Sequence, residues 1–248
     1  MIADLASDLA AALDPVIFAR RLGFEPDKWQ AGLLRSSAPR VALNCCRQAG
    51  KSTVTALLAL HTGIYEPGLI LVLSPSQRQS QETFRKITDF YALTDMTARA
   101  ETKLTLELVN GSRIVSLPGK EATIRGFSGV NLLIVDEAAR VPDELYYAIR
   151  PMLAVSQGRI ATLSTPFGKR GWWFQEWESS PEWERFEVPA TKCPRISPEF
   201  LEQERRTLGA WWFAQEYECQ FLDAQTAAFS YEDVQAAIKA ERVEAWSL

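Results

Sequence analysis

The feature that most constrains this chain is a turn between an apolar strand and a helix at residues 41–53, with the sequence VALNCCRQAGKST. The strand leads directly into GKS at residues 50–52, and a helical run follows over residues 54–61. Backbone N–H groups at a helix N-terminus, a lysine and a hydroxyl are the groups that hold a nucleoside triphosphate and its Mg²⁺. The spacing departs from G-x-x-x-x-G-K-[ST] only at Cys45, which replaces the first glycine. The segment therefore predicts a phosphate-binding loop.

A second pattern, NLLIVDE at residues 131–137, supplies carboxylates for the same site. It reads as a buried parallel strand that ends in two acids, and the carboxyl ends of such strands form the ligand-binding edge of open α/β sheets. Asp136 would hold Mg²⁺ through water or beside the Ser52 hydroxyl, and Glu137 would orient or deprotonate the attacking water. Alone, the pattern also fits a strand followed by a solvated acidic turn. Its pairing with the upstream loop favours a magnesium–phosphate site.

A third strand pattern, RIATLSTPFG at residues 159–168, ends in small hydroxyl residues and a proline–glycine turn. If this strand lies beside the first one, Ser164 and Thr165 sit near the γ-phosphate. Hydroxyl groups in that position can respond to the presence of phosphate. Taken alone, the segment is ordinary turn chemistry.

The order of apolar strands and helical runs predicts an α/β fold of the P-loop NTPase class, with a mostly parallel sheet and helices on both faces. A hairpin is predicted over residues 104–117, because two alternating runs flank Asn110-Gly111. A helix-rich segment to Arg35 precedes the core. The other predicted strands are 40–44, 69–73, 131–135 and 159–164, and the predicted helices are 51–63, 76–91 and 143–153.

The composition changes after residue 170, where tryptophans gather among charged helical runs at 198–208 and 209–219. We therefore predict an ATPase core at residues 1–170 and a small helical lid or linker subdomain at 171–248. The tryptophans are expected to pack the lid onto the sheet rather than to stack nucleic-acid bases. They are Trp172, Trp173, Trp177, Trp183, Trp211 and Trp212.

Charge and composition limit the possible partners. The net charge is −4, so the chain lacks the basic footprint of a constitutive DNA binder, and any grip on DNA must be local. Candidate contacts are Arg78, Arg85 and Lys86, although a solvated helix face is an equal interpretation. No apolar run reaches the length of a membrane span. Four cysteines without a C-x-x-C pair, and the single His61, provide no zinc site, and His61 is expected on a helix surface.

Together these motifs resemble the large terminase subunits of tailed bacteriophages, the motors that pump DNA into a procapsid. Residues 46–53 resemble the family's variant Walker A motif, in which the first glycine is commonly missing, residues 132–138 resemble Walker B, and residues 163–168 resemble the coupling motif. Residues 27–30 are similar to the region with the adenine-contacting glutamine, here Gln30. Residues 123–126 look like the segment that carries an arginine finger, here Arg125.

The resemblance implies a RecA-like (ASCE) core that binds ATP and Mg²⁺. The nucleotide contacts that it implies are Gln30, Cys46, Arg47, Gln48, Ala49, Gly50, Lys51, Ser52 and Thr53. Ser52 and Asp136 would hold the metal.

The sequence leaves two possible roles open for each of two arginines. Arg47 would reach the γ-phosphate within its own subunit or pair with an acid on the lid. Arg125 would enter the neighbouring subunit's site, or would be a surface arginine on a glycine-bearing loop.

The implied partners are double-stranded DNA, the portal protein and the small terminase subunit. The chain would form a homo-oligomeric ring, a pentamer, when docked on the procapsid in the cytoplasm of the infected bacterium, and would be a monomer in isolation. The family carries a nuclease domain downstream, and the residues after Tyr231 are too few for one, so we expect no nuclease activity from this chain.

Two other function classes remain open at this point. A helicase-like translocase of superfamily 2 shares the Asp-Glu pair but needs a second RecA-like domain, for which the chain is too short. A non-catalytic nucleotide-binding module would use ATP only to order an assembly interface. Glu137 discriminates between the classes, because a pure binder needs no second carboxylate beside the metal ligand.

Overall fold

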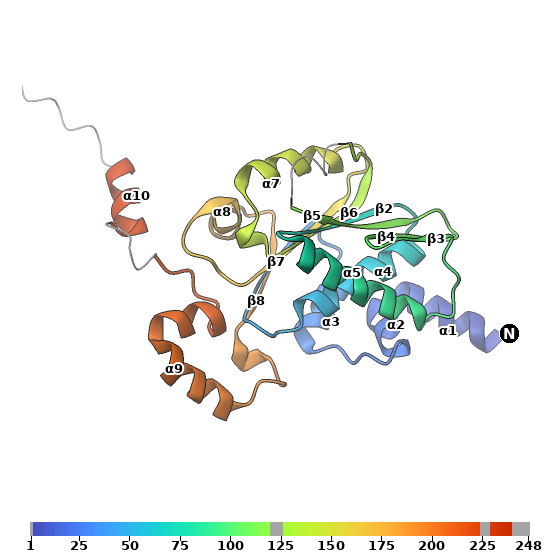
Figure 1. The fold of residues 1–248 in the computed structure, drawn as a ribbon, viewed down its shortest axis with the longest axis horizontal. Coiled ribbons are helices and arrows are strands. Elements are labelled where there is room, and N and C mark those ends of the chain that lie inside the picture. Colours follow the sequence, from blue (N-terminus) through green and yellow to red (C-terminus); the bar gives the residue numbers. More distant parts are fainter. Residues whose placement is uncertain (1, 120–125, 224–228, 240–248) are drawn as a thin grey trace, which may run out of the picture.

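The computed structural model describes residues 2–119, 126–223 and 229–239. Its centre is an eight-stranded sheet in the order β3-β4-β5-β2-β6-β7-β1-β8 (Figure 1). Strands β5, β2, β6, β7, β1 and β8 run parallel, whereas β3, β4 and β5 pair antiparallel. The bounds are β1 Arg40–Cys45, β2 Leu69–Ser74, β3 Ala100–Glu101, β4 Thr105–Glu107, β5 Arg113–Pro118, β6 Val130–Asp136, β7 Arg159–Ser164 and β8 Glu184–Val188.

Helices cover both faces of the sheet (Figure 1). Helices α2 to α5 lie against one face and share a hydrophobic core with it, while α7 and α8 cover the other face around a second core. The α-helices are α1 Ile2–Leu13, α2 Pro15–Arg21, α3 Lys28–Arg35, α4 Lys51–Tyr65, α5 Gln77–Ala92, α7 Asp143–Ile149, α8 Gly171–Ser179, α9 Pro198–Tyr217 and α10 Tyr231–Lys239. Short 3-10 helices are η1 Ala138–Arg140, η2 Arg150–Leu153 and η3 Ala190–Lys192.

The central strands bring the predicted motifs to one edge of the sheet. Strand β7 lies between β6 and β1, with Asp136 opposite Leu163 and Asn44 opposite Ser164. These strands are nearly continuous apolar runs because both of their faces are covered by helices. Since they are parallel, their carboxyl ends emerge side by side. The predicted condition that the third strand pattern neighbours the first is thereby confirmed.

The predicted α/β fold is confirmed, including the hairpin at β4 and β5. Two strands were not predicted. β3 has only two residues. β8 is a short edge strand whose residues are mostly exposed, so its alternation of apolar and polar side chains is too short to predict a strand. Because β8 pairs with β1, the segment after residue 170 contributes a strand to the sheet in addition to helices. The boundary within 198–219 is confirmed, since Gly209 leaves the helical conformation (φ 75°, ψ 168°) and kinks α9.

Tryptophan burial follows the prediction in part. Trp172 stacks on Tyr146 at 3.7 Å between ring centroids, and Trp173 and Trp183 are also buried. Trp212 differs, since it is 45% exposed on α9. The kink at Gly209 begins a new short helix in which Phe213 and Tyr217, rather than Trp212, face the core.

The expectation that His61 lies on a helix surface is wrong. The side chain is buried between α4 and the N-terminal helices, with Nε2 3.1 Å from the carbonyl oxygen of Ala11 and the ring against Phe18 and Tyr65. Burial lowers the pKa of His61. Packing of α1 and α2 over α4 explains the difference, because that long-range contact has no local sequence signal. Within the described residues, no helix is long and apolar enough to span a membrane.

Candidate nucleotide and magnesium site

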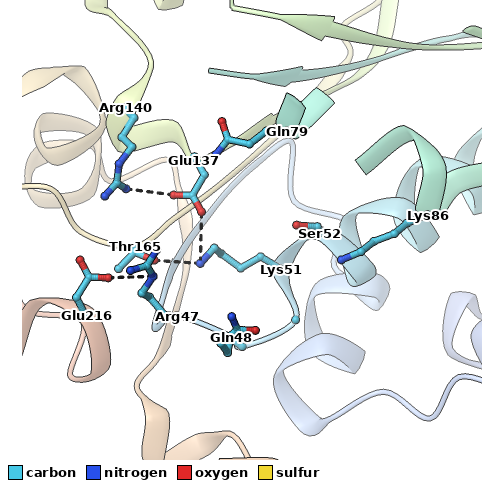
Figure 2. A pocket seen from close by; sticks show the side chains of 12 residues that line it. Arg47, Gln48, Lys51, Ser52, Gln79, Lys86, Glu137, Arg140, Thr165 and Glu216 are labelled. Carbon is cyan, nitrogen blue, oxygen red and sulfur yellow. Dashed lines mark hydrogen bonds and ion pairs between the residues drawn. The ribbon is translucent and has the colours of Figure 1, made fainter. Parts of the chain in front are cut away.

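The loop between β1 and α4 forms one wall of a cavity of about 340 Å³ at the carboxyl edge of the sheet (Figure 2). Its backbone is in the left-handed region at Gln48 (φ 59°) and at Gly50 (φ 91°), and Lys51 begins α4. Glycine is favoured at position 50 because a side chain would strain this backbone, and a Cβ there would lie 2.9 Å from Nε2 of Gln30. The loop therefore directs backbone groups and a helix N-terminus at the cavity.

The cavity is electropositive although the chain is acidic overall. Four basic and two acidic side chains line it, which suits an anionic ligand. Its lining residues are Arg47, Gln48, Ala49, Gly50, Lys51, Ser52, Gln79, Lys86, Glu137, Arg140, Thr165 and Glu216.

Lys51 connects three elements. Its buried ammonium group donates to Oγ1 of Thr165 at 3.0 Å and to the carbonyl oxygen of Cys46 at 3.3 Å, and lies 3.8 Å from Oε1 of Glu137 (Figure 2). The loop, the end of β6 and the end of β7 thus meet at one cation. A lysine in this position is free to exchange these oxygens for phosphate oxygens of a ligand.

Asp136 lies deeper, at the end of β6. One carboxylate oxygen is 3.5 Å from the Ser52 hydroxyl and 3.4 Å from the Thr83 hydroxyl, and the other accepts the backbone N–H of Glu137 at 3.0 Å. Burial raises the pKa of Asp136 to about 6, and the neighbouring charge of Glu137 adds to the rise. A buried carboxylate without a full cationic partner beside a serine hydroxyl is an oxygen donor set that fits Mg²⁺.

Glu137 stands at the rim with a strained backbone. It is in the left-handed region (φ 50°, ψ 45°), which is uncommon for a residue with a side chain. The conformation turns its carboxylate into the cavity, where Lys51 and Arg140 approach it. This is the placement expected of a group that acts on water beside a bound phosphate.

The two residues of the coupling pattern point in different directions. Thr165 lines the cavity and binds Lys51. Ser164 is buried away from the cavity, where its hydroxyl accepts the backbone N–H of Ala139 at 3.1 Å and donates to the carbonyl oxygen of Thr165 at 2.8 Å. Ser164 therefore ties β7 to the turn after Glu137, and only Thr165 is placed to approach a phosphate.

Arg47 pairs with the lid in this structure, which is one of the two alternatives that the sequence left open. Its Nε lies 3.4 Å from Oε2 of Glu216 on α9, and its backbone N–H donates to the carbonyl oxygen of the same residue at 2.9 Å (Figure 2). Because the Arg47 side chain is 66% exposed, its guanidinium can leave this pair without unfolding the loop.

The other predicted contacts have mixed positions. Cys46 is buried, with Sγ 3.7 Å from Sγ of Cys193, and is not among the residues that line the cavity. The Thr53 hydroxyl, in the first turn of α4, accepts from Lys86 at 3.4 Å. Gln30 is buried behind Gly50, and its side-chain oxygen accepts the N–H of Asp27 in a capping box. Arg125 lies outside the described residues.

Several residues of the site were not predicted. Gln79 and Lys86 reach the cavity from α5, Arg140 from η1 and Glu216 from α9, and Arg195 binds the carbonyl oxygen of Ala49 at 2.8 Å from behind the loop. Lys86 is also one of the candidate DNA contacts. Its helical spacing from Thr83, which touches Asp136, is the one sequence signal that places it on the inner face of α5.

Asp136→Asn should stabilise the protein in the absence of Mg²⁺ while removing metal-dependent activity. Folding raises the pKa of Asp136 from 3.8 to about 6, so the folded state loses stability as the pH rises between these values and bears the full cost above pH 6. Removing the charge at pH 7.5 without Mg²⁺ should therefore raise the free energy of unfolding by about 1–3 kcal/mol. Thermal unfolding with EDTA measures it.

Asp89→Asn is the matched control for this experiment, because Asp89 is exposed on α5. Its stability should match that of the wild type at pH 7.5 and at pH 4. The advantage of Asp136→Asn should fall to about 0.5 kcal/mol near pH 4, because Asp136 is then neutral in the folded state and roughly half ionised in the unfolded state. A variant less stable than the wild type at pH 7.5 would contradict the assignment of a buried, uncompensated charge.

Comparisons with known proteins identify the family. The profile of the family "Terminase large subunit, T4likevirus-type, N-terminal" matches residues 43–236. The terminase large subunit of Thermus phage G20c is 24% identical over an alignment of 267 residues, which covers 91% of this chain and 54% of the relative. This chain thus spans about half the length of such relatives.

Solved structures share the fold. The large terminase ATPase domain of Thermus phage P74-26 superposes with a TM-score of 0.73 at 23% identity, covering 83% of this chain and 97% of that one. The large terminase of another thermophilic bacteriophage, in complex with ADP, gives a TM-score of 0.65 at 10% identity, covering 79% and 53%. On the match over residues 43–236, the chain belongs to the family of terminase large subunit N-terminal domains.

Proposed function

We propose that this chain is a Mg²⁺-dependent ATPase that powers the translocation of double-stranded viral DNA into a procapsid. One observation carries the proposal: Lys51 and Glu137, from two separate elements, line a single electropositive cavity, and the buried Asp136 lies beneath it beside the Ser52 hydroxyl. The family match supports it, and so does the terminase from a thermophilic bacteriophage that shares the fold and was solved in complex with ADP.

Each group has a defined task in this proposal. Loop N–H groups and Lys51 would bind the β- and γ-phosphates, and the Ser52 hydroxyl and Asp136 would hold Mg²⁺, which would supply charge neutralisation on the phosphates. Glu137 would orient water for attack on the γ-phosphorus and accept its proton, while the bond from that phosphorus to the β–γ bridging oxygen breaks and ADP leaves with phosphate. Lys51 would release the Thr165 hydroxyl when it turns to the phosphates. The segment after β7 would therefore respond to the bound nucleotide.

The partners follow from the family and are part of the proposal. They are double-stranded DNA, the portal protein, the small terminase subunit and further copies of the chain in a pentameric ring in the infected host's cytoplasm, where Arg125 enters the neighbouring site. Among the candidate DNA contacts, Arg78 and Arg85 are exposed on α5, whereas Lys86 faces the nucleotide cavity. The division into a core at 1–170 and a lid at 171–248 is retained, with the β8 strand of the second part completing the sheet.

A non-catalytic assembly module is the second candidate function. The position of Glu137 argues against it, because a strained backbone that aims a carboxylate into a phosphate cavity stabilises neither the fold nor an anionic ligand. Such strain is expected where chemistry requires it.

Lys51→Ala and Glu137→Gln should separate binding from chemistry. Lys51→Ala should abolish phosphate binding, because the loop loses its buried ammonium group. Glu137→Gln should retain MgATP binding while ATP turnover falls on the order of 100-fold or more. Thermal stabilisation by MgATPγS and a phosphate-release assay, each with and without double-stranded DNA, measure the two effects. Wild-type turnover in Glu137→Gln would exclude Glu137 as the catalytic group.

Arg47→Ala should leave nucleotide affinity within about tenfold of the wild type and lose most hydrolysis, as expected of a cation that acts on the transferring phosphoryl group. Glu216→Gln is the matched variant, since it breaks the same ion pair but leaves the guanidinium in place. If Arg47 acts on the phosphate, Glu216→Gln should retain hydrolysis. Equal losses in both variants would instead show that the ion pair itself is required, and an unfolded Arg47→Ala variant would favour a structural role.

A further inference from the structure

Both oxygens of the Glu137 carboxylate face a cation, and each cation also touches the segment after β7. Oε1 lies 3.8 Å from Nζ of Lys51, which donates to Thr165. Oε2 lies 3.3 Å from Nη1 of Arg140, whose guanidinium carbon lies 4.7 Å from the centroid of the Phe167 ring. Figure 2 shows the carboxylate between the two cations. The two contacts differ in one respect: Lys51 belongs to the phosphate loop, whereas Arg140 does not.

Arg140 has contacts of its own that do not involve Lys51. Its backbone N–H donates to the carbonyl oxygen of Glu137 at 2.9 Å in the turn that starts η1, and the N–H of the preceding residue, Ala139, donates to the Ser164 hydroxyl. Its side chain is exposed, and its guanidinium lies over the Phe167 ring, which Arg170 also approaches at 4.9 Å. A planar guanidinium can stack on the ring and donate to the carboxylate at once.

Phosphate binding would affect the two cations unequally. Lys51 must turn toward the β- and γ-phosphates, so Oε1 loses its partner and becomes available to water. A carboxylate with no remaining partner would be free to rotate away from the incoming negative charge. Arg140 would still hold Oε2, because its anchor on Phe167 does not depend on the phosphates.

We propose that Arg140 is a positioning residue for Glu137, which fixes one carboxylate oxygen so that the other is aligned with water when Lys51 engages phosphate. The inference rests on the proposed ATPase function and deepens it. Phe167 holds Arg140 in place through its ring. The segment after β7 therefore contacts both cations that face Glu137: Phe167 contacts Arg140, and Thr165 contacts Lys51.

The test is single-turnover ATP hydrolysis by the full chain with Mg²⁺, together with steady-state KM. Arg140→Ala should lower kcat about 10- to 100-fold, because a misaligned group loses roughly that factor. KM for ATP should stay within about threefold. Arg140→Lys should recover part of the loss, since a lysine can contact the carboxylate but cannot stack as a planar group. Arg20→Ala, which breaks an exposed ion pair between α2 and Glu25, is the control and should match the wild type.

The decisive measurement combines two variants. If Arg140 acts through Glu137, Arg140→Ala should cost nothing further in a Glu137→Gln background, since the group it positions is already gone. Two results would show that Arg140 contacts the nucleotide directly and would overturn the positioning role. One is a double variant whose loss of kcat equals the product of the losses in the two single variants. The other is a KM for Arg140→Ala raised as much as its kcat is lowered. Wild-type kcat in Arg140→Ala would also overturn it.

Phe167→Leu provides an independent check of the support. It keeps an apolar side chain but removes the ring face, so kcat should fall in the same direction as in Arg140→Ala, by a smaller factor. Failure of the inference is distinguishable from failure of the proposed function: a wild-type chain with neither hydrolysis nor stabilisation by MgATPγS would remove both, whereas an active wild type with a fully active Arg140→Ala would remove the inference alone.

Discussion

The ammonium group of Lys51 is the interaction on which the site depends. A buried cation is costly unless oxygen atoms surround it, and here they come from the loop at Cys46, from Thr165 after β7 and from Glu137 after β6. Since β7 pairs with both β1 and β6, parallel pairing delivers all three to one place. These groups are therefore already assembled, and in the proposed function a phosphate would replace existing oxygens instead of ordering a loose loop.

Much of the fold and of this site could be predicted because each central strand carries its chemistry at its own carboxyl end. Strands β1, β6 and β7 are mostly apolar runs, so their strand character and their burial are local properties of the sequence. Once the strands are parallel, the positions of Lys51 and Asp136 relative to each other follow from geometry alone. That is why the loop and the two carboxylates were located without any knowledge of the packing.

Side-chain partners between distant elements could not be predicted. Arg140 and Glu216 are ordinary charged residues on surface-like helical runs, and only the tertiary structure brings them to Glu137 and Arg47. Lys86 illustrates the same limit, because an amphipathic helix shows which residues share a face but not which face meets the site. The strand β8 was not predicted for a related reason. Its residues are mostly exposed and its alternation of apolar and polar side chains is short, so only its pairing with β1 in the folded chain identifies it as a strand.

The segment after residue 170 holds the phosphate loop from behind at three successive points. The N–H of Cys46 binds the carbonyl oxygen of Val188, the N–H of Arg47 binds that of Glu216, and Arg195 binds the carbonyl oxygen of Ala49. Two of these contacts use backbone groups on both sides, so they do not depend on side-chain identity and have no sequence signal. They hold the loop whose residues 47–50 line the cavity. A loop tied in this way changes its backbone only if these hydrogen bonds break or if β8 or α9 moves with it, and for that reason the segment after residue 170 is mechanically part of the cavity wall.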